Sequence, residues 1–546
     1  MHTMKKFVSL ALVVLLMLAS IACAKPANDP KDNADLQPAT TDANTTDTNP
    51  SAEPVVVDKE GGTLKIGLTL DFTKPLWLDT RNQNDFIYTN CYLETLMVFD
   101  ETGAPQPFLA KSVTGDAAEK TYTIVLNEGI KFHDGSMLNA EVCAWNLQMY
   151  KDQGVLSTSF LKQFDRAEVV DEYTVKVYLT DWDSTFMYGL ARQAGFMHSK
   201  KQYDENGAEG CAAHPIGTGP FMFESHEADI GTTFVRFDEY WQGRPNLDAI
   251  EITVYADHTT ANAALQAGEI NVRFPDSPND AKELSALGFS IQKTRVPSAS
   301  VTVCFNCTNE NDPFYDVRVR QAAAYAIDRD AIMKALWGDY GSPITQYGIT
   351  GQPWYNNDVA GFEYNPEKAK ELLAEAGYPD GFDTKIMTST TTSYVNVCQI
   401  VAEQLATVGI RVELTPSDSA TYSKAMSGWE TGMLYHPMTL SNGGPSIMNA
   451  NFVQGISSGL AVTSFIHPDD LNDTIHAAAS AVTEEEANKL WQQAEKMIFE
   501  DYCLLKAIGA IYDIAALDSN IHDSGIGETV SRVPGNWTLW NAWIEK

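Results

Sequence analysis

Apolar and polar residues alternate in several short stretches of the chain, and this two-residue period predicts β-strands. The clearest stretches lie at residues 61–72, 120–132, 167–179 and 214–237. Between and after them, apolar residues recur every three or four positions, which predicts helices. These helical segments lie at 84–100, 139–150, 259–270, 315–327, 329–338, 364–378 and 484–502, and residues 396–416 predict a helix followed by a strand. Strands and helices are interleaved, so the pattern indicates the α/β class.

The ends of these helices carry capping signals. Asn139 follows the turn "HDGS", in which Gly135 suits a positive φ, and its side chain is expected to cap the next helix. The expected buried face of that helix consists of Val142, Trp145, Met149 and Tyr150. Further caps are expected at Asp316, Asp328 and Asn365, and helix stops at Gly268 and Gly377. The segment 84–100 is expected to bury Ile87, Leu93, Leu96 and Met97.

The N-terminus has the pattern of a secretion signal. Lys5 and Lys6 precede a 12-residue apolar segment, shorter than the roughly 20 residues of a membrane span. Small residues then lead to Cys23, which resembles a bacterial lipobox, although Ser20 stands where that motif usually has Leu. Ordinary cleavage after Ala22 is the alternative. Residues 24–56 contain no aromatic residue and one Leu, a composition that favours a disordered tether. The sequence therefore predicts a signal peptide (1–22) and a lipidated Cys23 with its tether (23–60).

The net charge of −34 argues against one class of partner, the nucleic acids. Such an acidic surface repels phosphate backbones, so no nucleic-acid partner is expected. Seven cysteines remain after Cys23, an odd and scattered set that does not form a disulfide framework. Cys304 and Cys307 form a C-x-x-C pattern, but they lie in a strand-like run that would point them to opposite faces. They are interpreted as ordinary core or edge cysteines.

Sequence motifs for catalysis are missing. The chain contains no phosphate loop, zinc-binding H-E-x-x-H helix or G-x-S-x-G elbow. His133 and Asp134 are adjacent, which invites a catalytic interpretation, but their place between a strand and a capped helix favours a structural role. We therefore expect neither an enzyme nor a bound cofactor, and no catalytic or metal-ligating residue. The alternatives left open are a secreted hydrolase using paired carboxylates and a ligand sensor for a signalling partner.

Five longer stretches together resemble one family. They are "GIKFHDGSMLNAEVCAWNLQMY", "PIGTGPFMF", "DEYWQGRPNLDAIEITVYADHTTANAALQAGEI", "DVRVRQAAAYAIDRDAI" and "YNPEKAKELLAEAGYPDGFD". In this order they resemble the family 5 extracellular solute-binding proteins, the peptide- and nickel-binding receptors of ATP-driven importers. The resemblance runs from about Gly61 to the C-terminus. It also implies that "KFHDG" belongs to the scaffold.

The resemblance implies a two-lobed α/β clamshell of the periplasmic-binding-protein type with an extra domain, three domains in all (class II, cluster C). Domain I would comprise 61–98, 217–300 and 515–546, domain II 99–216, and domain III 301–514. The ligand would lie between domains I and III, which close at hinges near 300 and 515. The implied protein is a monomer that delivers a small solute to ABC permease subunits. The tethered start implies attachment to the outer face of the cell membrane through lipidated Cys23, in the Gram-positive manner.

The ligand is where the chain departs from the family pattern. Peptide receptors of this family hold the peptide amine with an Asp about four residues before a Pro. Counting from Pro445 places Ser441 in that position. No Asp lies between Asp418 and Asp469, and Glu430 is the one carboxylate in that interval. A buried ammonium needs a carboxylate partner, so a generic peptide is less favoured than another small polar solute. A peptide held by another acid, a peptide-like molecule, an amino-acid derivative and a metal chelate remain candidates.

Candidate ligand-binding residues come from loops and from the resemblance. Asp71 and Trp77 follow the first strand, and Trp354 and Tyr355 lie in an irregular segment. Arg192 resembles a position near which nickel receptors use arginines to bind a chelator's carboxylates. For each aromatic residue the alternative is a place in the core or on the surface, and for Arg192 it is a surface ion pair. The complete set of candidates is Asp71, Trp77, Arg192, Trp354, Tyr355, Tyr435, His436, Ser441 and Asn442.

Overall fold

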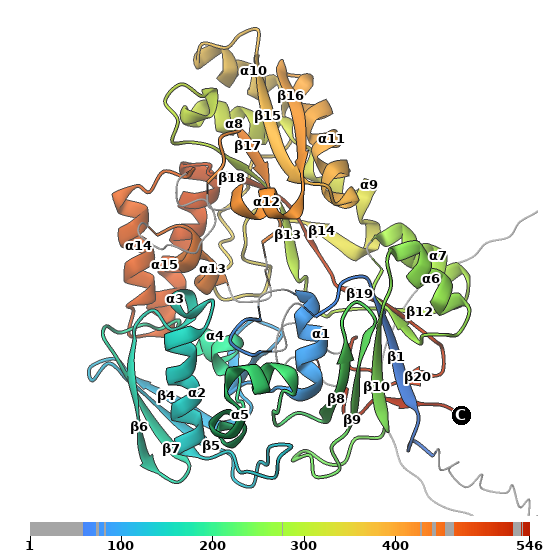
Figure 1. The fold of residues 1–546 in the computed structure, drawn as a ribbon. Coiled ribbons are helices and arrows are strands. Elements are labelled where there is room, and N and C mark those ends of the chain that lie inside the picture. The colour runs from blue at the N-terminus through green and yellow to red at the C-terminus, as the bar shows by residue number, and fades with distance from the viewer. Residues whose placement is uncertain are drawn as a thin grey trace, which may run out of the picture. The chain divides into compact units, whose positions relative to one another are not determined.

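The structure is a computed structural model, and its secondary structure confirms the α/β class (Figure 1). It describes residues 58–72, 76–80, 83–275, 277–425, 428–438, 440, 444–453, 464–527, 537 and 539–546. Three sheets of four or more strands organise these residues.

A seven-stranded sheet contains the first strand. Its order is β12-β19-β11-β1-β10-β9-β8. The strands are β1 (Thr63–Leu68), β8 (Phe221–Glu227), β9 (Gly231–Arg236), β10 (Ala249–Val254), β11 (Val272–Arg273), β12 (Ser290–Lys293) and β19 (Ile514–Leu517). β1 runs parallel to β10 and β11, whereas β8 and β9 form an antiparallel hairpin. The helices of this part are α1 (Gln83–Tyr92), α6 (His258–Gln266) and α7 (Pro278–Ala286).

A four-stranded antiparallel sheet of order β4-β5-β7-β6 follows α1 in the sequence. Its strands are β4 (Ala110–Asp116), β5 (Thr121–Leu126), β6 (Phe164–Asp171) and β7 (Thr174–Leu179). Helix α2 (Ala140–Gln153) lies across this sheet (Figure 1). The other elements are the β2 (Met97–Phe99) and β3 (Pro105–Pro107) pair, α3 (Ser157–Phe160), α4 (Phe186–Leu190) and α5 (Lys200–Ala213).

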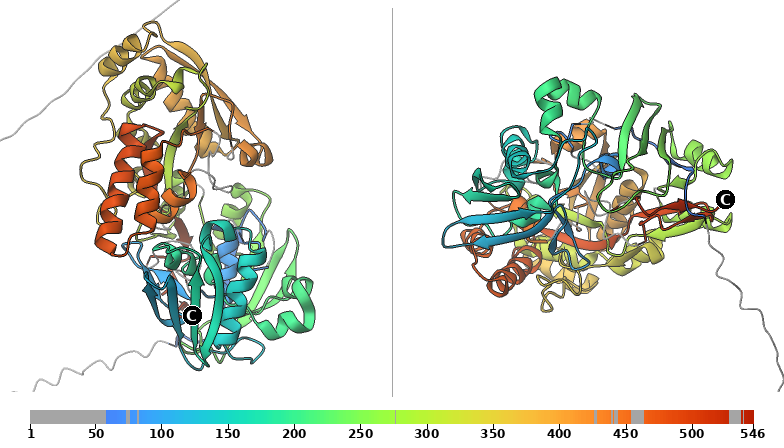
Figure 2. Two further views of the ribbon diagram at one scale, coloured as in Figure 1. Left: turned by 90° about the vertical axis from the view of Figure 1, so that its left-hand side faces the viewer. Right: turned by 90° about the horizontal axis from the view of Figure 1, so that it is seen from below.

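A six-stranded sheet of order β14-β18-β13-β17-β15-β16 is built from residues after 298. Its strands are β13 (Ala299–Phe305), β14 (Gly341–Pro343), β15 (Phe382–Ser389), β16 (Ile410–Ser417), β17 (Met433–Tyr435) and β18 (Leu505–Ile511). Its helices are α8 (Val317–Ala326), α9 (Arg329–Leu336), α10 (Pro366–Glu375), α11 (Thr392–Ala406), α12 (Ser419–Ala425), α13 (Gly444–Asn451), α14 (Asp469–Ala479) and α15 (Glu484–Lys496). Figure 2 shows α14 and α15 packed side by side. A short pair of β20 (Ile521–His522) and β21 (Trp543–Ile544) lies near the C-terminus.

The hydrophobic cores define two lobes. One continuous core joins the seven-stranded and four-stranded sheets, and we call the part built on it the first lobe. Two further cores contain residues between 301 and 510, and we call this part the second lobe. The chain crosses between the lobes twice, and the crossings are hydrogen-bonded to each other through Thr294 N to Asp513 O (3.0 Å) and Ser298 N to Ile511 O (2.8 Å).

The capping predictions are confirmed. The Asn139 side chain accepts a hydrogen bond from Val142 N at 3.0 Å, and Asp316, Asp328 and Asn365 cap α8, α9 and α10 in the same manner. Gly135, Gly268 and Gly377 adopt positive φ. These outcomes rest on contacts within about four residues, which explains why the local sequence predicts them.

Two local predictions are wrong. The segment 84–100 is not one helix, because α1 ends at Tyr92 and Met97 begins β2. Gly217 packs against the carbonyl of Tyr92, and Leu96 N bonds to Gly195 O, so contacts distant in sequence end the helix. The buried face of α2 consists of Ala140, Cys143, Asn146, Leu147 and Tyr150, whereas Val142, Trp145 and Met149 are only partly buried.

The seven cysteines among the described residues are free and buried. Cys304 and Cys307 lie in the same core, which confirms their interpretation as core residues. The prediction that they point to opposite faces is wrong, because β13 ends at Phe305 and Cys307 lies beyond the strand. Within the described ranges, no helix has the length and apolar character required to cross a membrane.

Candidate functional site

Arg192 lies between α4 and the short turn Gln193–Gly195, at a junction of several first-lobe segments. Gln193 donates to Thr80 O at 3.4 Å, and Val155 N bonds to Leu78 O, so the segments around 78, 155 and 192 meet here. The guanidinium of Arg192 lies 5.3 Å from the ring centre of Phe160. A cation over an aromatic face is favourable, but it supplies no hydrogen-bond acceptor.

The Arg192 side chain is buried without a complete set of partners. It is only 7% exposed, and burial lowers the pKa of its guanidinium to about 9. Nε donates to Gln193 Oε1 at a long 3.3 Å, whereas the buried Nη1 has no hydrogen-bond partner among the described residues. No described carboxylate balances the charge. Burying a cation without a full set of hydrogen-bond acceptors costs free energy. An anion that accepted a hydrogen bond from Nη1 would reduce this cost.

Arg320 shows how the same chain satisfies a buried arginine that has a structural role. It is 1% exposed, and its guanidinium donates to the backbone carbonyls of Phe314, Tyr315, Tyr502 and Cys503 at 2.7–3.1 Å. These bonds tie α8 to the segment before β18. Arg192 differs from Arg320 because its buried Nη1 has no hydrogen-bond partner among the described residues.

Trp354 and Tyr355 belong to a second-lobe loop that touches the first lobe. The Trp354 ring is 1% exposed and stands edge-on to Tyr188 of α4, with ring centres 6.5 Å apart. Its buried Nε1 has no partner among the described residues, and Tyr355 is partly buried. Trp354 therefore contacts the helix that immediately precedes Arg192.

Glu495 holds the first part of the same loop. Its carboxylate is fully buried and accepts hydrogen bonds from Tyr347 N (3.1 Å) and Gly348 N (2.8 Å). Burial raises the pKa of Glu495 to about 8. The Tyr347 hydroxyl in turn contacts the sulfur of Met438, next to the end of β17.

Tyr435 and His436 lie at that end of β17 in the second lobe. The Tyr435 ring is 1% exposed and packs on Tyr394, with ring centres 4.9 Å apart. The Tyr422 hydroxyl donates to Tyr435 O at 2.7 Å and lies 3.3 Å from His436 Nδ1. Desolvation lowers the pKa of His436 to about 3, so its imidazole is neutral at physiological pH.

Trp77 and Asp71 are engaged within the first lobe. Trp77 is 1% exposed and stacks on His198, with ring centres 4.2 Å apart. The Asp71 carboxylate accepts hydrogen bonds from Phe72 N and Asp229 N, both at 2.7 Å. Their roles in ligand binding stay predictions.

Three predicted positions lie outside the described residues: Ser441, Asn442 and Cys23. The one carboxylate between Asp418 and Asp469 is Glu430, which is exposed. The described residues of that interval therefore contain no buried carboxylate that could hold a peptide amine.

The adjacent His133 and Asp134 have scaffold contacts. His133 Nε2 lies 2.9 Å from Gly219 O, and burial lowers the pKa of the imidazole to about 4. Asp134 accepts hydrogen bonds from Ser136 and from Ser199 Oγ (2.6 Å), which itself caps α5. The pair joins the turn before α2 to the start of α5.

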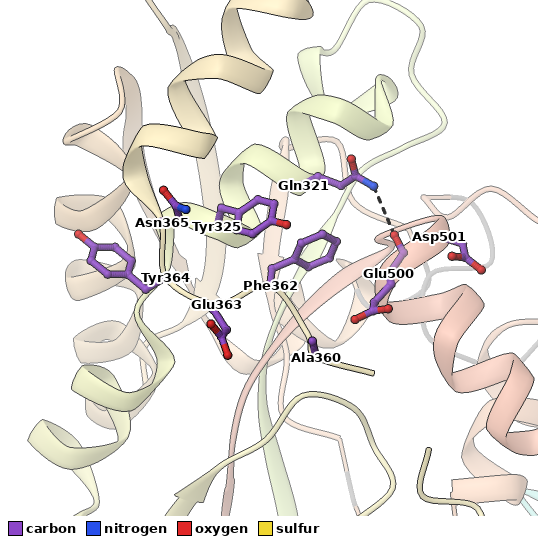
Figure 3. Close-up of a pocket in the computed structure, with 9 residues that line it drawn as sticks. All are labelled: Gln321, Tyr325, Ala360, Phe362, Glu363, Tyr364, Asn365, Glu500 and Asp501. Atoms are coloured by element: carbon purple, nitrogen blue, oxygen red, sulfur yellow. Dashed lines mark hydrogen bonds between the residues drawn. The ribbon is translucent and has the colours of Figure 1, made fainter. Parts of the chain in front are cut away.

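A cavity of about 690 Å³ lies on the second lobe, where Figure 3 shows the rings of Tyr325, Phe362 and Tyr364 beside three carboxylates. Glu500 Oε1 accepts from Gly361 N at 2.9 Å, Asp501 pairs with Lys496, and Glu363 is exposed. None of these acids is a buried charge without a partner, unlike Arg192. Among the described residues, no cluster of three His, Cys, Asp or Glu side chains is arranged to hold a metal.

Sequence reasoning missed the residues that surround Arg192. Phe160 lies under the Arg192 guanidinium, and the ring of Tyr188 stands beside that of Trp354. Tyr188 precedes Arg192 by four residues in "MYGLAR", and this spacing was the available signal. For Phe160 no sequence signal existed, because its contact depends on the packing of α3.

Solved structures share this fold. CtaP, an ABC transporter substrate-binding protein of Listeria monocytogenes, has a TM-score of 0.79 at 22% identity, covering 89% of this chain and 100% of that chain. DppA of Helicobacter pylori in complex with the peptide STSA has a TM-score of 0.74 at 21% identity over 90% and 99% of the chains. AgaA of A. tumefaciens R10 with agropinic acid has a TM-score of 0.73 at 24% identity over 89% and 99%. The protein thus has the two-lobed clamshell fold of periplasmic binding proteins.

The sequence comparisons define the family. The model of the bacterial extracellular solute-binding proteins, family 5 (middle region), matches residues 104–458. The glutathione-binding protein GsiB of Pectobacterium atrosepticum is 32% identical over 394 residues, 69% of this chain and 73% of that protein. GsiB of Salmonella typhimurium is 30% identical over 450 residues, covering 78% and 85%. The chain belongs to the bacterial extracellular solute-binding proteins of family 5.

Membership confirms the broad functional predictions. The protein is an extracytoplasmic solute-binding protein that works with an ABC importer, and it is not an enzyme. The predicted scaffold role of "KFHDG" agrees with the contacts of His133 and Asp134.

Proposed function

We propose that this protein captures a small, carboxylate-bearing solute between its lobes and that Arg192 binds the carboxylate. The observation that carries the proposal is the buried guanidinium of Arg192, whose Nη1 has no partner within the described ranges. An arginine fork matches a carboxylate with two parallel hydrogen bonds, and such charge-assisted bonds are strong where water is excluded. The solute would replace the missing acceptor.

The solute class follows from this chemistry together with the relatives. The GsiB proteins are named for glutathione, a peptide-like molecule with free carboxylates, and AgaA was solved with agropinic acid. The chain also lacks an Asp between Asp418 and Asp469, which disfavours a site built around a peptide amine. A peptide-like acid or amino-acid derivative is therefore favoured over a generic peptide. Trp354, Tyr355, Tyr435 and His436 would supply the second-lobe wall. Ser441 and Asn442, which lie outside the described residues, stay candidate ligand-binding residues.

The proposed architecture keeps the predicted domains. Domain I (61–98, 217–300, 515–546) and domain II (99–216) would move together, because they share one hydrophobic core. Domain III (301–514) would move against them about the two crossings at residues 294–298 and 511–514. We further propose a monomer anchored through lipidated Cys23 to the outer face of the membrane. Incorporation of a labelled fatty acid that a Cys23→Ala variant abolishes tests the anchor.

The test of the ligand site is a calorimetric titration. The protein is unfolded, dialysed free of co-purified solute and refolded, then titrated with glutathione, agropinic acid and short peptides. The probes include versions with amidated carboxyl groups. We expect at least one free acid to bind and its amide to bind more weakly by 10-fold or more. Arg192→Lys should weaken the acid by a similar factor, because Lys lacks the bidentate fork. Equal binding of acid and amide would refute the role of Arg192.

A further inference from the structure

Domain II of this chain donates a set of hydrogen bonds to the second lobe, and we call this contact the clasp. It consists of Trp182 and Ser184 on the first lobe and Ala478, Ala479 and Ala481 on the second. Trp182 Nε1 donates to Ala481 O at 3.0 Å, and Ser184 N donates to Ala479 O at 2.7 Å. Ser184 Oγ adds a longer bond of 3.3 Å to Ala478 O.

Two acceptors of the clasp, the carbonyls of Ala478 and Ala479, lie at a helix end, whereas Ala481 O follows the helix by two residues. Helix α14 ends at Ala479, and the last carbonyls of a helix have no partner within the helix. These carbonyls also form the negative end of the helix dipole, which favours hydrogen-bond donors. Ala478, Ala479 and Ala481 are at most 8% exposed, so donors from the first lobe replace water at this helix end.

The donors of the clasp are held in place before they meet the helix. The Trp182 ring stacks on Tyr122, with ring centres 4.9 Å apart and planes 13° from parallel. A Cβ on Gly115 would lie 2.5 Å from the Trp182 ring, so the glycine leaves room for it. Asp183 accepts hydrogen bonds from the backbone and side chain of Thr185 at 2.9 and 2.6 Å, and the Tyr122 hydroxyl donates to Asp183 O. Little further ordering is needed when the clasp forms.

The two sides of the clasp belong to different hydrophobic cores. Tyr122 and Phe186 lie in the first-lobe core, whereas Leu471, Ile475 and Ala478 of α14 lie in a second-lobe core. The lobes are joined covalently by the two chain crossings, and Trp354 of the second lobe also faces Tyr188 of the first. Rotation about those crossings changes the separation of the two cores, so the hydrogen bonds of the clasp must break when the lobes separate.

We propose that the clasp is a closure latch through which domain II stabilises the closed form of the protein. This proposal rests on the proposed closure of the lobes around a solute. Apparent solute affinity is proportional to the fraction of molecules in the binding-competent form, so a latch outside the solute site sets affinity without touching the solute. Trp354 makes a separate contact with domain II, since its ring lies close to Gly103 and faces Tyr188.

The first test measures hydrogen exchange at the Ser184 amide in the solute-free protein. Trp182→Phe retains most of the stacking on Tyr122 but removes the indole donor. Loss of one such hydrogen bond should accelerate exchange at Ser184 about fivefold. The control is Trp145→Phe, because Trp145 lies in the same domain without contacting the second lobe, and it should leave this exchange unchanged. Equal exchange at Ser184 in the wild type and Trp182→Phe would overturn the latch. Because no solute is present, that failure would leave the proposed solute site standing.

A second test does not depend on removing a side chain. Ser184→Cys with Ala479→Cys places two thiols where the backbones approach to 2.7 Å. We expect X-ray scattering of the solute-free oxidised protein to give a smaller radius of gyration than the reduced protein. Identical radii in the two forms would mean that this contact never opens, and the latch proposal would fail.

Discussion

Replacing Arg192 by Met should stabilise the solute-free protein. Burial lowers the pKa of this guanidinium from 12.5 to about 9. At about 1.36 kcal/mol per pKa unit, the difference of roughly 3.5 units corresponds to about 5 kcal/mol of penalty on the charged form at pH 7. Met keeps an apolar stem over Phe160 and removes the charge. Replacement of a buried ion pair by apolar side chains is often neutral or stabilising by about 1–4 kcal/mol, and we expect removal of the Arg192 charge to give a gain in this range.

The assay is urea unfolding of solute-free protein at pH 7, followed by tryptophan fluorescence. Arg320→Met is the matched control, since Arg320 is equally buried but donates to four carbonyls. Its loss leaves those carbonyls without this donor and should cost about 3–5 kcal/mol. The two substitutions are chemically identical and should have opposite signs.

The same Arg192→Met protein should lose affinity for a carboxylate-bearing solute. If Arg192 serves solute binding at a cost to folding stability, its replacement should make the protein more stable and weaken solute binding. If Arg192→Met instead lowers the free energy of unfolding by more than about 1 kcal/mol, as the Arg320→Met control does, the reasoning is refuted. It would mean that the Arg192 charge is already compensated in the solute-free fold.

Three further outcomes are expected. Burial raises the pKa of the Glu94 carboxyl from 4.5 to about 7. Between these pH values the folded protein keeps the Glu94 proton that the unfolded chain releases, so the protein loses about 3 kcal/mol of stability as pH rises from 4.5 to 7. The unfolding free energy of Glu94→Gln relative to wild type should therefore increase by that amount over this interval, and a flat difference in urea titrations at both pH values would contradict it. Asn139→Ala should cost about 1 kcal/mol in thermal unfolding, because the first turn of α2 loses its cap. His133→Ala should leave solute affinity unchanged in calorimetry, and a large loss in a folded variant would reopen a binding or catalytic role for this residue.

The sequence predicted the parts of the fold that depend on neighbouring residues. The bond from Val142 N to Asn139 spans three residues, and Gly377 ends α10 through its own positive φ. Such features need little information from the rest of the chain. The α/β class followed for the same reason, because the period of apolar residues is a local property.

Local patterns were wrong where distant contacts decide. The helical spacing of apolar residues continues past Tyr92, but α1 ends at this residue. Gly217, which is distant in sequence, packs closely against the Tyr92 carbonyl. On α2 the predicted stripe was displaced, because the four-stranded sheet covers the face that carries Cys143 and Leu147. Periodicity identifies an apolar helix but not the surface against which it packs.

The candidate site divides in the same way. The sequence by itself determined the family and the absence of an Asp between Asp418 and Asp469. The ligand-binding residues that it suggested stay predictions. Only the tertiary structure separated Arg192 from Arg320, since the sequence around neither residue shows whether its guanidinium is buried or hydrogen-bonded. Desolvation and hydrogen-bond satisfaction depend on atoms brought from distant segments, such as Phe160 beneath Arg192 and Tyr502 beside Arg320. The energy of a buried charge is a property of its surroundings, and those surroundings exist only after the chain has folded.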